Sequence, residues 1–244
     1  MRAAIGRWVG VVGLGLILGA GVFWWQMNAI GSERLDEVRG RVEGGLKRAM
    51  EEAGLRYGAP VFVRVLKEEG ELELWVEVKE GERWKLFRKW RIAGMSGKLG
   101  PKLKEGDLQA PEGFYEVGKK QLNPMSRFHL SFNVGYPNAY DRFHGRTGSL
   151  IMVHGSNVSI GCFAMTDPVI EEIYLLVEAA LKGGQEAVKV QIFPFRMTPE
   201  KMAAVEGEWA GFWREALWPG YERFEKTGVP PEVGVREGRY WVGE

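Results

Sequence analysis

The sequence predicts a mainly β domain with flanking helices, an α+β fold, and three observations support this prediction. Runs of β-branched and aromatic residues, with charged residues alternating between them, recur over residues 61–193. Apolar residues at helical spacing precede these runs, interrupt them once and follow them. A chain of 244 residues, 45% hydrophobic and 27% charged, is long enough for one sizeable core with appendages.

The strand predictions rest on alternation within short runs. Glu69-Gly70 separates the first two runs and favours a hairpin between them. Residues 94–106, rich in Gly and Lys, are predicted to form a loop in which the lysines of residues 98–104 face solvent. The predicted strands span residues 61–66, 72–78, 84–92, 113–117, 128–134, 149–154 and 188–193.

Three helices are predicted around these strands. Residues 32–57 place apolar side chains at helical spacing among many charges, which favours an amphipathic helix leading to the domain. A second helix is expected to begin with Asp167 as its cap, followed by a proline, and to end at Gly183-Gly184. A third begins at Thr198, and the tail over residues 226–244 is predicted to be irregular.

The N-terminal segment predicts a membrane anchor. Arg2 and Arg7 precede an uncharged apolar run at residues 8–25, which as a helix would span about 27 Å, close to the bilayer core of about 30 Å. The arginines predict a cytoplasmic N-terminus, with the rest of the chain outside the inner membrane, in the periplasm. A cleavable signal peptide is the alternative, but residues 23–25 are aromatic where small residues precede a cleavage site.

Composition excludes several functions. A net charge of +1 gives no reason to expect nucleic-acid binding, because neutralising many phosphates needs a concentrated basic excess. Three histidines and one cysteine are too few for a sulfur-rich zinc site, and no metal is expected. The lone cysteine forms no internal disulfide, and in an exported protein such a residue is a candidate reactive thiol.

The segment at residues 151–167 carries the chemistry. An apolar run delivers His154 into a loop of small residues that leads to Gly161-Cys162 and then to the start of a helix. A free thiol has a pKa of about 8.5, so it needs a base such as imidazole, and the helix dipole also favours thiolate. Gly161 permits close approach of a carbonyl, whose oxyanion the Cys162 amide could bind. The pattern predicts Cys162 as nucleophile and His154 as base.

These residues resemble a known motif. The pattern His-Gly-x-x-x-Ser-x-Gly-Cys, read at His154, Gly155, Ser159, Gly161 and Cys162, is similar to the catalytic motif of YkuD-type L,D-transpeptidases. The resemblance extends over residues 61–197. Within it, residues 109–115 resemble the family's Thr-Pro-x-Gly-x-Phe turn, and further segments resemble the YafK-like subgroup at residues 122–130, 136–141 and 193–197.

The resemblance implies a β-sandwich catalytic domain and a cysteine acyltransferase. In that family the cysteine attacks the carbonyl before a terminal D-amino acid of a peptidoglycan stem peptide and forms a thioester. An amine resolves the thioester in a transpeptidase, and water does so in a hydrolase. Carried over, Cys162 is the nucleophile, His154 the base, the Gly155 carbonyl orients the imidazole, and Ser159 shapes the loop. No metal or organic cofactor is implied.

Two departures from the family pattern keep alternatives open. Ile160 stands where many members have His, and Ala164 where many have Arg or Asn. A hydrolase that releases cross-links, or a protein bound to peptidoglycan, is therefore an alternative to the transpeptidase. An alternative of another class is a catalytically silent envelope-binding module. The expected partners are stem peptides, the membrane and a peptidoglycan-linked envelope protein.

Three further residues are candidates for substrate binding. Arg146 could hold a carboxylate through two hydrogen bonds, and Tyr136 and His129 could line the cleft. The expected domain organisation is an anchor or signal sequence (1–30), an amphipathic linker helix (31–58), a catalytic domain (59–197) and a C-terminal helical extension (198–244).

Overall fold

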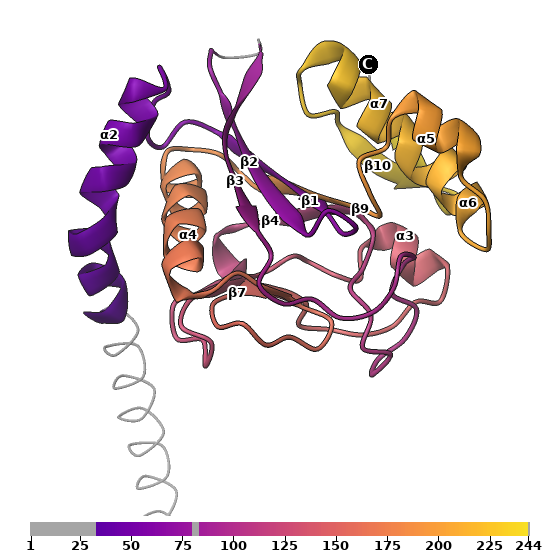
Figure 1. Ribbon diagram of the computed structural model, residues 1–244, viewed down its shortest axis with the longest axis horizontal. Coiled ribbons are helices and arrows are strands. Elements are labelled where there is room, and N and C mark those ends of the chain that lie inside the picture. The colour runs from indigo at the N-terminus through magenta and orange to yellow at the C-terminus, as the bar shows by residue number, and fades with distance from the viewer. Residues whose placement is uncertain (1–32, 80–82, 244) are drawn as a thin grey trace, which may run out of the picture.

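The computed structural model describes residues 33–79 and 83–243. The apolar run at residues 8–25, and with it the anchor expected over residues 1–30, lies outside the described residues. Within the described ranges, no helix is both long enough and apolar enough to cross a bilayer. The fold mixes sheets and helices as predicted: helix α4 (Asp167–Lys182) lies against the strands, and further helices lie on the opposite side of the molecule (Figure 1).

The larger sheet has five strands in the order β3-β2-β1-β9-β4. β1 pairs parallel with β9, and all other neighbours in this sheet pair antiparallel. Every residue of β1 is buried, so both faces of the sheet are covered at its centre. Five predicted strands are confirmed as β1 (Val61–Leu66), β2 (Glu71–Glu77), β3 (Trp84–Arg91), β4 (Gly113–Val117) and β9 (Val188–Phe193).

A smaller sheet has the order β5-β6-β7-β8, in which β7 and β8 are parallel. The strand predicted at residues 128–134 is shorter than expected, because His129 takes a φ of 69° and interrupts the extended chain. Its strands are β5 (Leu122–Asn123), β6 (Ser131–Asn133), β7 (Met152–His154) and β8 (Phe163–Ala164). The connections contain the helical turns η2 (Lys119–Gln121) and α3 (Ala139–Phe143).

Helix α4 joins the two sheets into one core. It contacts β1 and β9 of the larger sheet and β6 and β7 of the smaller one. Its predicted apolar face is fully buried, and each such side chain stabilises the fold by about 1.5–3 kcal/mol. The helix ends before Gly183, as predicted. Buried residues of this face include Ile170, Ile173, Tyr174, Val177 and Leu181.

The predicted amphipathic helix is confirmed, and it packs on α4. The chain is helical over residues 33–52, where the π-helical stretch η1 (Arg39–Glu43) precedes α2 (Gly44–Glu52). Figure 1 shows α2 alongside α4, on the side away from the C-terminal helices. Arg39 forms an ion pair of 2.7 Å with Glu178 of α4. The apolar side chains buried against the domain are Leu35, Val38, Leu46 and Met50.

The C-terminal residues differ from prediction. The helix predicted from Thr198 begins there, with Thr198 as its N-cap, but the prediction of one continuous helix is wrong, because Val205 is extended and Gly207 has a φ of 102°. The prediction of an irregular tail is also wrong, since a hairpin closes the chain. These elements are α5 (Pro199–Ala204), α6 (Ala210–Phe212), η3 (Trp213–Leu217), α7 (Trp218–Thr227), β10 (Val233–Arg236) and β11 (Arg239–Val242).

Arg64 of β1 is a charged residue of the sheet that the C-terminal helices bury. Its side chain is buried, with Nε donating to Glu73 at 2.8 Å and Nη1 to Glu225 of α7 at 2.5 Å. The guanidinium also lies over the rings of Trp75 and Phe224, at 5.2 and 5.1 Å. The second face of the sheet is therefore an interior in which charge is paired.

Candidate active site

His154 ends β7 with its ring held in one orientation. The residue is buried, and its Nδ1 lies 2.6 Å from the carbonyl oxygen of Gly155. A carbonyl only accepts hydrogen bonds, so Nδ1 carries the proton and Nε2 keeps its lone pair. The ring of Phe128 packs against the imidazole, with ring centroids 4.7 Å apart. The imidazole is therefore a neutral base whose Nε2 is its basic atom.

Glycine is required at position 155 because the chain is crowded there. An added Cβ would lie 2.4 Å from Asp167 Oδ1 and 2.7 Å from the Phe128 carbonyl oxygen. The same Asp167 oxygen accepts the N–H of Ser156 at 2.7 Å. The prediction that Asp167 caps α4 is wrong, since Thr166 is the N-cap and Asp167 is the first helical residue. Its carboxylate instead stabilises the turn after His154 by accepting the Ser156 N–H.

Cys162 directly precedes β8, the strand that runs beside the end of β7 where His154 lies. In the parallel ladder His154 pairs with Ala164 and Val153 with Phe163, so Cys162 falls opposite Met152. Met152 stands two positions before His154 on β7, so the thiol lies near the imidazole along the strand, at a strand rise of about 3.3 Å per residue. The cysteine is half-buried and is the free thiol of the chain.

The thiol hydrogen-bonds to the strand rather than to the base. Its Sγ accepts the N–H of Met152 at 3.4 Å and donates to the carbonyl of Leu150 at 3.6 Å. Within residues 33–79 and 83–243, no hydrogen bond joins Cys162 to His154. A side-chain rotation of the cysteine is therefore needed before a proton can pass to Nε2, and apo sites often tighten in this way on binding substrate.

Burial sets the resting protonation of the pair. It lowers the pKa of His154 below its ordinary value, and the hydrogen bond to Gly155 opposes this only in part. Burial also raises the pKa of the Cys162 thiol, against the opposing effects of the Met152 N–H and the charge of Lys102. The resting pair is thus a neutral thiol beside a neutral imidazole, and thiolate forms by proton transfer during attack.

These directions give a pH prediction. Because the pKa of His154 is lowered, the base stays deprotonated to more acidic pH, and the acid limb of kcat/KM should fall below about pH 6.5. Because the pKa of Cys162 is raised, alkylation of the free enzyme should titrate above about pH 8.5. Iodoacetamide labelling and kcat/KM measured across pH check both limbs. A thiol that titrates below pH 7 would contradict this assignment.

The loop before the nucleophile is held by hydroxyl groups. Ser159 Oγ donates to the Cys162 carbonyl oxygen at 2.7 Å. Gly161 has a φ of 89°, a conformation that favours glycine, and its N–H donates to Ser96 Oγ at 2.6 Å. Ser96 in turn donates to the carbonyl of Leu108 at 2.7 Å. Since the Gly161 amide is already used, the Cys162 amide is the better candidate for an oxyanion donor.

Ser96 and Lys102 are functional candidates that sequence reasoning missed, and both come from the loop at residues 94–106. The prediction that its lysines face solvent is wrong for Lys102, which is buried and donates to Asp107 at 2.5 Å. A buried ion pair anchors this loop, since Lys67 Nζ lies 2.9 Å from Glu112 and 2.8 Å from the carbonyl of Gly100. No local pattern marks a loop lysine for burial, so the sequence held no signal for it.

Two predicted substrate-binding residues are engaged elsewhere in the structure. Arg146 is buried, pairs with Asp141 at 2.9 Å and lies over the rings of Tyr140 and Phe212. A substrate carboxylate would have to share its guanidinium with Asp141. The hydroxyl of Tyr136 donates to backbone carbonyls at 3.2 Å, which fixes the ring as part of the loop wall.

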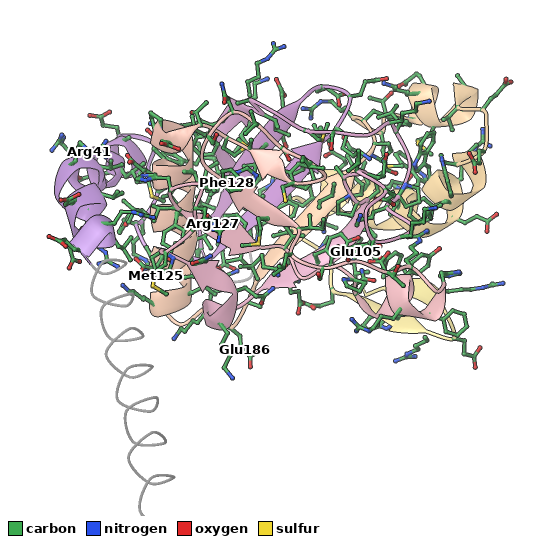
Figure 2. The ribbon with its side chains drawn as sticks, turned by 90° about the horizontal axis from the view of Figure 1, so that it is seen from below. Arg41, Glu105, Met125, Arg127, Phe128 and Glu186 are labelled. Atoms are coloured by element: carbon green, nitrogen blue, oxygen red, sulfur yellow. The ribbon has the colours of Figure 1, made fainter. Side chains whose placement is uncertain are left out.

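The third, His129, lies in the seam between the N-terminal helix and α4. Its Nε2 is 2.7 Å from Glu171 Oε1, which also accepts from Arg41 at 2.7 Å. The side chain of Arg34 contacts the main chain of the same loop. Its Nη1 donates to the carbonyl oxygens of Ser126 at 3.0 Å and His129 at 2.7 Å. Figure 2 shows Met125, Arg127 and Phe128, which belong to this loop, and Arg41 on the helix.

Arg34 is therefore a positioning residue, and Arg34→Ala should lower kcat about 10-fold. The loop it holds carries Phe128, whose ring contacts His154 and whose carbonyl accepts the Gly155 N–H at 3.0 Å. Small misplacements of a catalytic group cost rate without abolishing it. Arg48→Ala, an exposed arginine on the same helix, is the control and should keep wild-type kcat. Equal loss in both variants would contradict the role.

A cleft lies beside the residues that hold the thiol, although neither Cys162 nor His154 lines it. It has a volume of about 470 Å³ and includes Leu150 and Met152, the two residues that hydrogen-bond to Cys162. We name it the thiol-side cleft. Its walls are rich in amide groups, which suits a peptide because every backbone unit offers a donor and an acceptor. Its other lining residues are Lys120, Gln121, Leu122, Asn123, Pro124, Met125 and Asn133.

Comparison with solved structures gives alignments of low similarity. The crystal structure of the helical cell shape determining protein Pgp2 from Campylobacter jejuni aligns with a TM-score of 0.44 and 22% identity, covering 65% of this chain and 59% of that one. The structure of Bd1075 from Bdellovibrio bacteriovorus aligns with a TM-score of 0.38 and 22% identity, covering 56% and 48%.

Sequence comparison is more decisive. Residues 71–192 match the family model of the L,D-transpeptidase catalytic domain, YkuD. The Escherichia coli K12 protein named "Putative L,D-transpeptidase YafK" is 48% identical over 188 residues, which is 77% of this chain and 75% of that protein. Its counterpart from strain O157:H7 matches equally. The suspected family is confirmed: this chain belongs to the enzymes that carry the L,D-transpeptidase catalytic domain.

Proposed function

We propose that this enzyme is a cysteine acyltransferase that acts on peptidoglycan stem peptides through a thioester on Cys162. The observation that carries the proposal is the position of the Cys162 thiol at Met152, two residues before His154 on β7, with the His154 tautomer fixed by the Gly155 carbonyl. A fixed Nδ1–H leaves Nε2 as a base beside a thiol that has no positive partner strong enough to ionise it at rest.

The reaction follows from these positions. The Cys162 proton passes to His154 Nε2 as sulfur attacks the carbonyl before the terminal D-amino acid. The C–N bond then breaks, and the imidazolium gives its proton to the leaving amine. An acceptor amine or a water next loses a proton to Nε2 and attacks the thioester. The C–S bond breaks, and the thiolate recovers the proton from the imidazolium.

Hydrolysis is the second candidate outcome, and Ala164 is the observation that favours it. The residue is fully buried, and its backbone is bonded to Ala93 and Gly94. It offers no polar group two positions after the nucleophile. Ile160, before the Gly-Cys pair, is 73% exposed and is apolar as well. With neither position able to bind an acceptor's carboxylate, water can complete the reaction and release a cross-link or an attached envelope protein.

A defined muropeptide assay tests the proposal. Purified enzyme is incubated with a tetrapeptide-bearing muropeptide, with and without an excess of a D-amino acid as acceptor amine, and the products are read by mass spectrometry. Both outcomes of the thioester mechanism release the terminal D-amino acid. Exchange that requires the amine assigns a transpeptidase, and tripeptide formed without it assigns a hydrolase. No release in either case would contradict the proposal.

The proposed location is the cell envelope. Peptidoglycan lies outside the cytoplasmic membrane, so a catalytic domain acting on it must be exported. The uncharged run at residues 8–25 supports a single-pass inner-membrane anchor, and the helix at residues 33–52 would then lead from the membrane surface to the catalytic domain. Membrane fractionation before and after alkaline carbonate extraction tests the anchor, and loss of the protein into the wash would exclude it.

A further inference from the structure

A second cleft lies between β4 and β9 of the larger sheet, the start of α3 and the β10–β11 hairpin. Its volume is about 500 Å³, and neither Cys162 nor His154 lines it. We name it the distal cleft. The wall residues that matter to its chemistry are Phe114, Gln121, Asn138, Lys189, Gln191 and Tyr240.

The floor of the distal cleft carries an unpaired buried amide. Gln191 of β9 is 2% exposed, and its Oε1 has no hydrogen-bond partner within the described part of the chain. Buried polar groups in native proteins are almost always paired, since an unpaired group loses the hydrogen bonds that water gave it. Because Gln191 also lines the cleft, a hydroxyl or N–H of a ligand bound there would supply the donor that this oxygen lacks.

The basic groups around this amide have partners of their own. Lys189 pairs with Glu232 and donates to the Pro231 carbonyl at 3.2 Å. Arg142 donates to the carbonyl of Pro137. Glu116 and Arg142 add one charge of each sign to the lining, so the charges balance, and the other lining groups are amides beside aromatic rings. Such a lining suits an uncharged ligand with many hydroxyl and amide groups better than a carboxylate or a phosphate.

One residue joins the two clefts. Gln121 lines both the distal cleft and the thiol-side cleft. Its amide is held rigidly, with Nε2 donating to the carbonyls of Glu116 at 2.8 Å and Asn133 at 3.1 Å, and Oε1 accepting the Gly118 N–H at 2.7 Å. Gln121 is therefore a fixed wall shared by the two clefts, along which a substrate held in the thiol-side cleft can continue into the distal cleft.

We propose that the distal cleft binds the glycan part of the substrate, as a neutral N-acetylated amino sugar hydrogen-bonded to Gln191. This proposal rests on the proposed function, because it assigns the far end of the same polymer. A stem peptide is attached to the glycan at the end opposite its terminal D-amino acid, so the two clefts would hold opposite ends of one molecule. The sugar's acetamido N–H or a hydroxyl donates to Gln191 Oε1, and Phe114 and Tyr240 provide ring surface.

Direct binding of a peptide-free sugar tests the site without relying on catalysis. The probe is an N-acetylglucosamine tetrasaccharide, titrated calorimetrically into the full chain. Gln191→Leu should weaken binding about 5- to 10-fold, the effect of losing one buried hydrogen bond. Ala139→Trp, which adds bulk to an exposed lining residue, should abolish it. Ala203→Trp is the matched control, since Ala203 is an exposed helical alanine outside both clefts.

Turnover separates this proposal from the proposed function. For intact sacculi relative to a free stem peptide, the ratio of kcat/KM should fall in Gln191→Leu and in Ala139→Trp, and stay at the wild-type value in Ala203→Trp. Absent tetrasaccharide binding, or binding that both substitutions leave unchanged, would overturn the glycan site. Weaker binding of the free stem peptide in Ala139→Trp would also overturn the glycan site, because the distal cleft would then hold peptide. Failure to process any stem peptide while the sugar still binds would overturn the proposed function alone.

Discussion

Replacing Cys162 with alanine should lower the rate of stem-peptide processing by at least about 10³-fold, because the thioester can no longer form. The thiol makes two long hydrogen bonds, at 3.4 and 3.6 Å, and is half-buried, so its removal leaves the fold nearly unchanged. The melting temperature should therefore stay within about 2–3 °C of the wild type for a domain of this size. Initial rates with a defined muropeptide, measured beside a thermal melt, check both parts.

Cys162→Ser is the matched variant for this experiment. Serine preserves the shape and hydrogen bonding of the side chain but is far harder to ionise, and the neutral His154 is too weak a base to compensate. We expect the serine variant to be folded and nearly as inactive as the alanine variant. Wild-type turnover in either variant would remove Cys162 from the mechanism.

Replacing His154 with alanine should lower kcat by about 10²- to 10⁴-fold, the usual contribution of a positioned general base. The residual rate should rise with pH, because hydroxide can then generate the thiolate that Nε2 no longer supplies. Alkylation of Cys162 by iodoacetamide should also slow at neutral pH. Stopped-assay kinetics and labelling kinetics over the same pH range measure the two effects independently.

His144→Ala provides the control for loss of an imidazole. Its ring packs at a tilt against Tyr140 of α3, with centroids 4.3 Å apart, and its Nε2 lies 2.9 Å from the carbonyl oxygen of Gly238 in the C-terminal hairpin. This variant should keep wild-type kcat and labelling rates. Equal losses in the His144 and His154 variants would mean that the effect is one of stability rather than of catalysis.

Much of the fold follows from local pattern. The strands of the larger sheet alternate or are continuously apolar over five to eight residues, which is long enough for the pattern to be read. Helix α4 combines a proline near its start, an apolar face and a glycine after its end. Cys162 and His154 could be expected on neighbouring strands, because one loop connects two adjacent parallel strands, one ending at His154 and the other beginning just after Cys162.

The features that local pattern does not predict depend on long-range contacts. Arg34 lies 95 positions from His129, whose carbonyl it binds, and neither segment contains a sequence pattern that predicts this contact. Lys102 is buried because the loop at residues 94–106 folds back over Tyr136, which its sequence of glycines and lysines does not encode. Strands as short as β5 and β8, with two residues each, carry no readable period.

The burial and the partners of charged residues were also hard to predict from the sequence, because they too depend on long-range contacts. Arg64 alternates with valines in β1 as a solvent-facing residue would, yet α7 covers that face and buries the side chain. Arg146 has the chemistry of a carboxylate-binding residue, yet it is paired with Asp141. Whether a charge meets solvent, substrate or a partner is decided by elements far away in the chain.

Trapping the acyl-enzyme tests the central claim most directly. Wild-type protein mixed with a stem tetrapeptide and quenched in acid within the first turnover should gain the mass of the acyl group, on the peptide fragment that contains Cys162. Hydroxylamine should remove the adduct, as expected of a thioester. Turnover that proceeds with no adduct on this fragment, or an adduct that persists when Cys162 is replaced by alanine, would contradict the account.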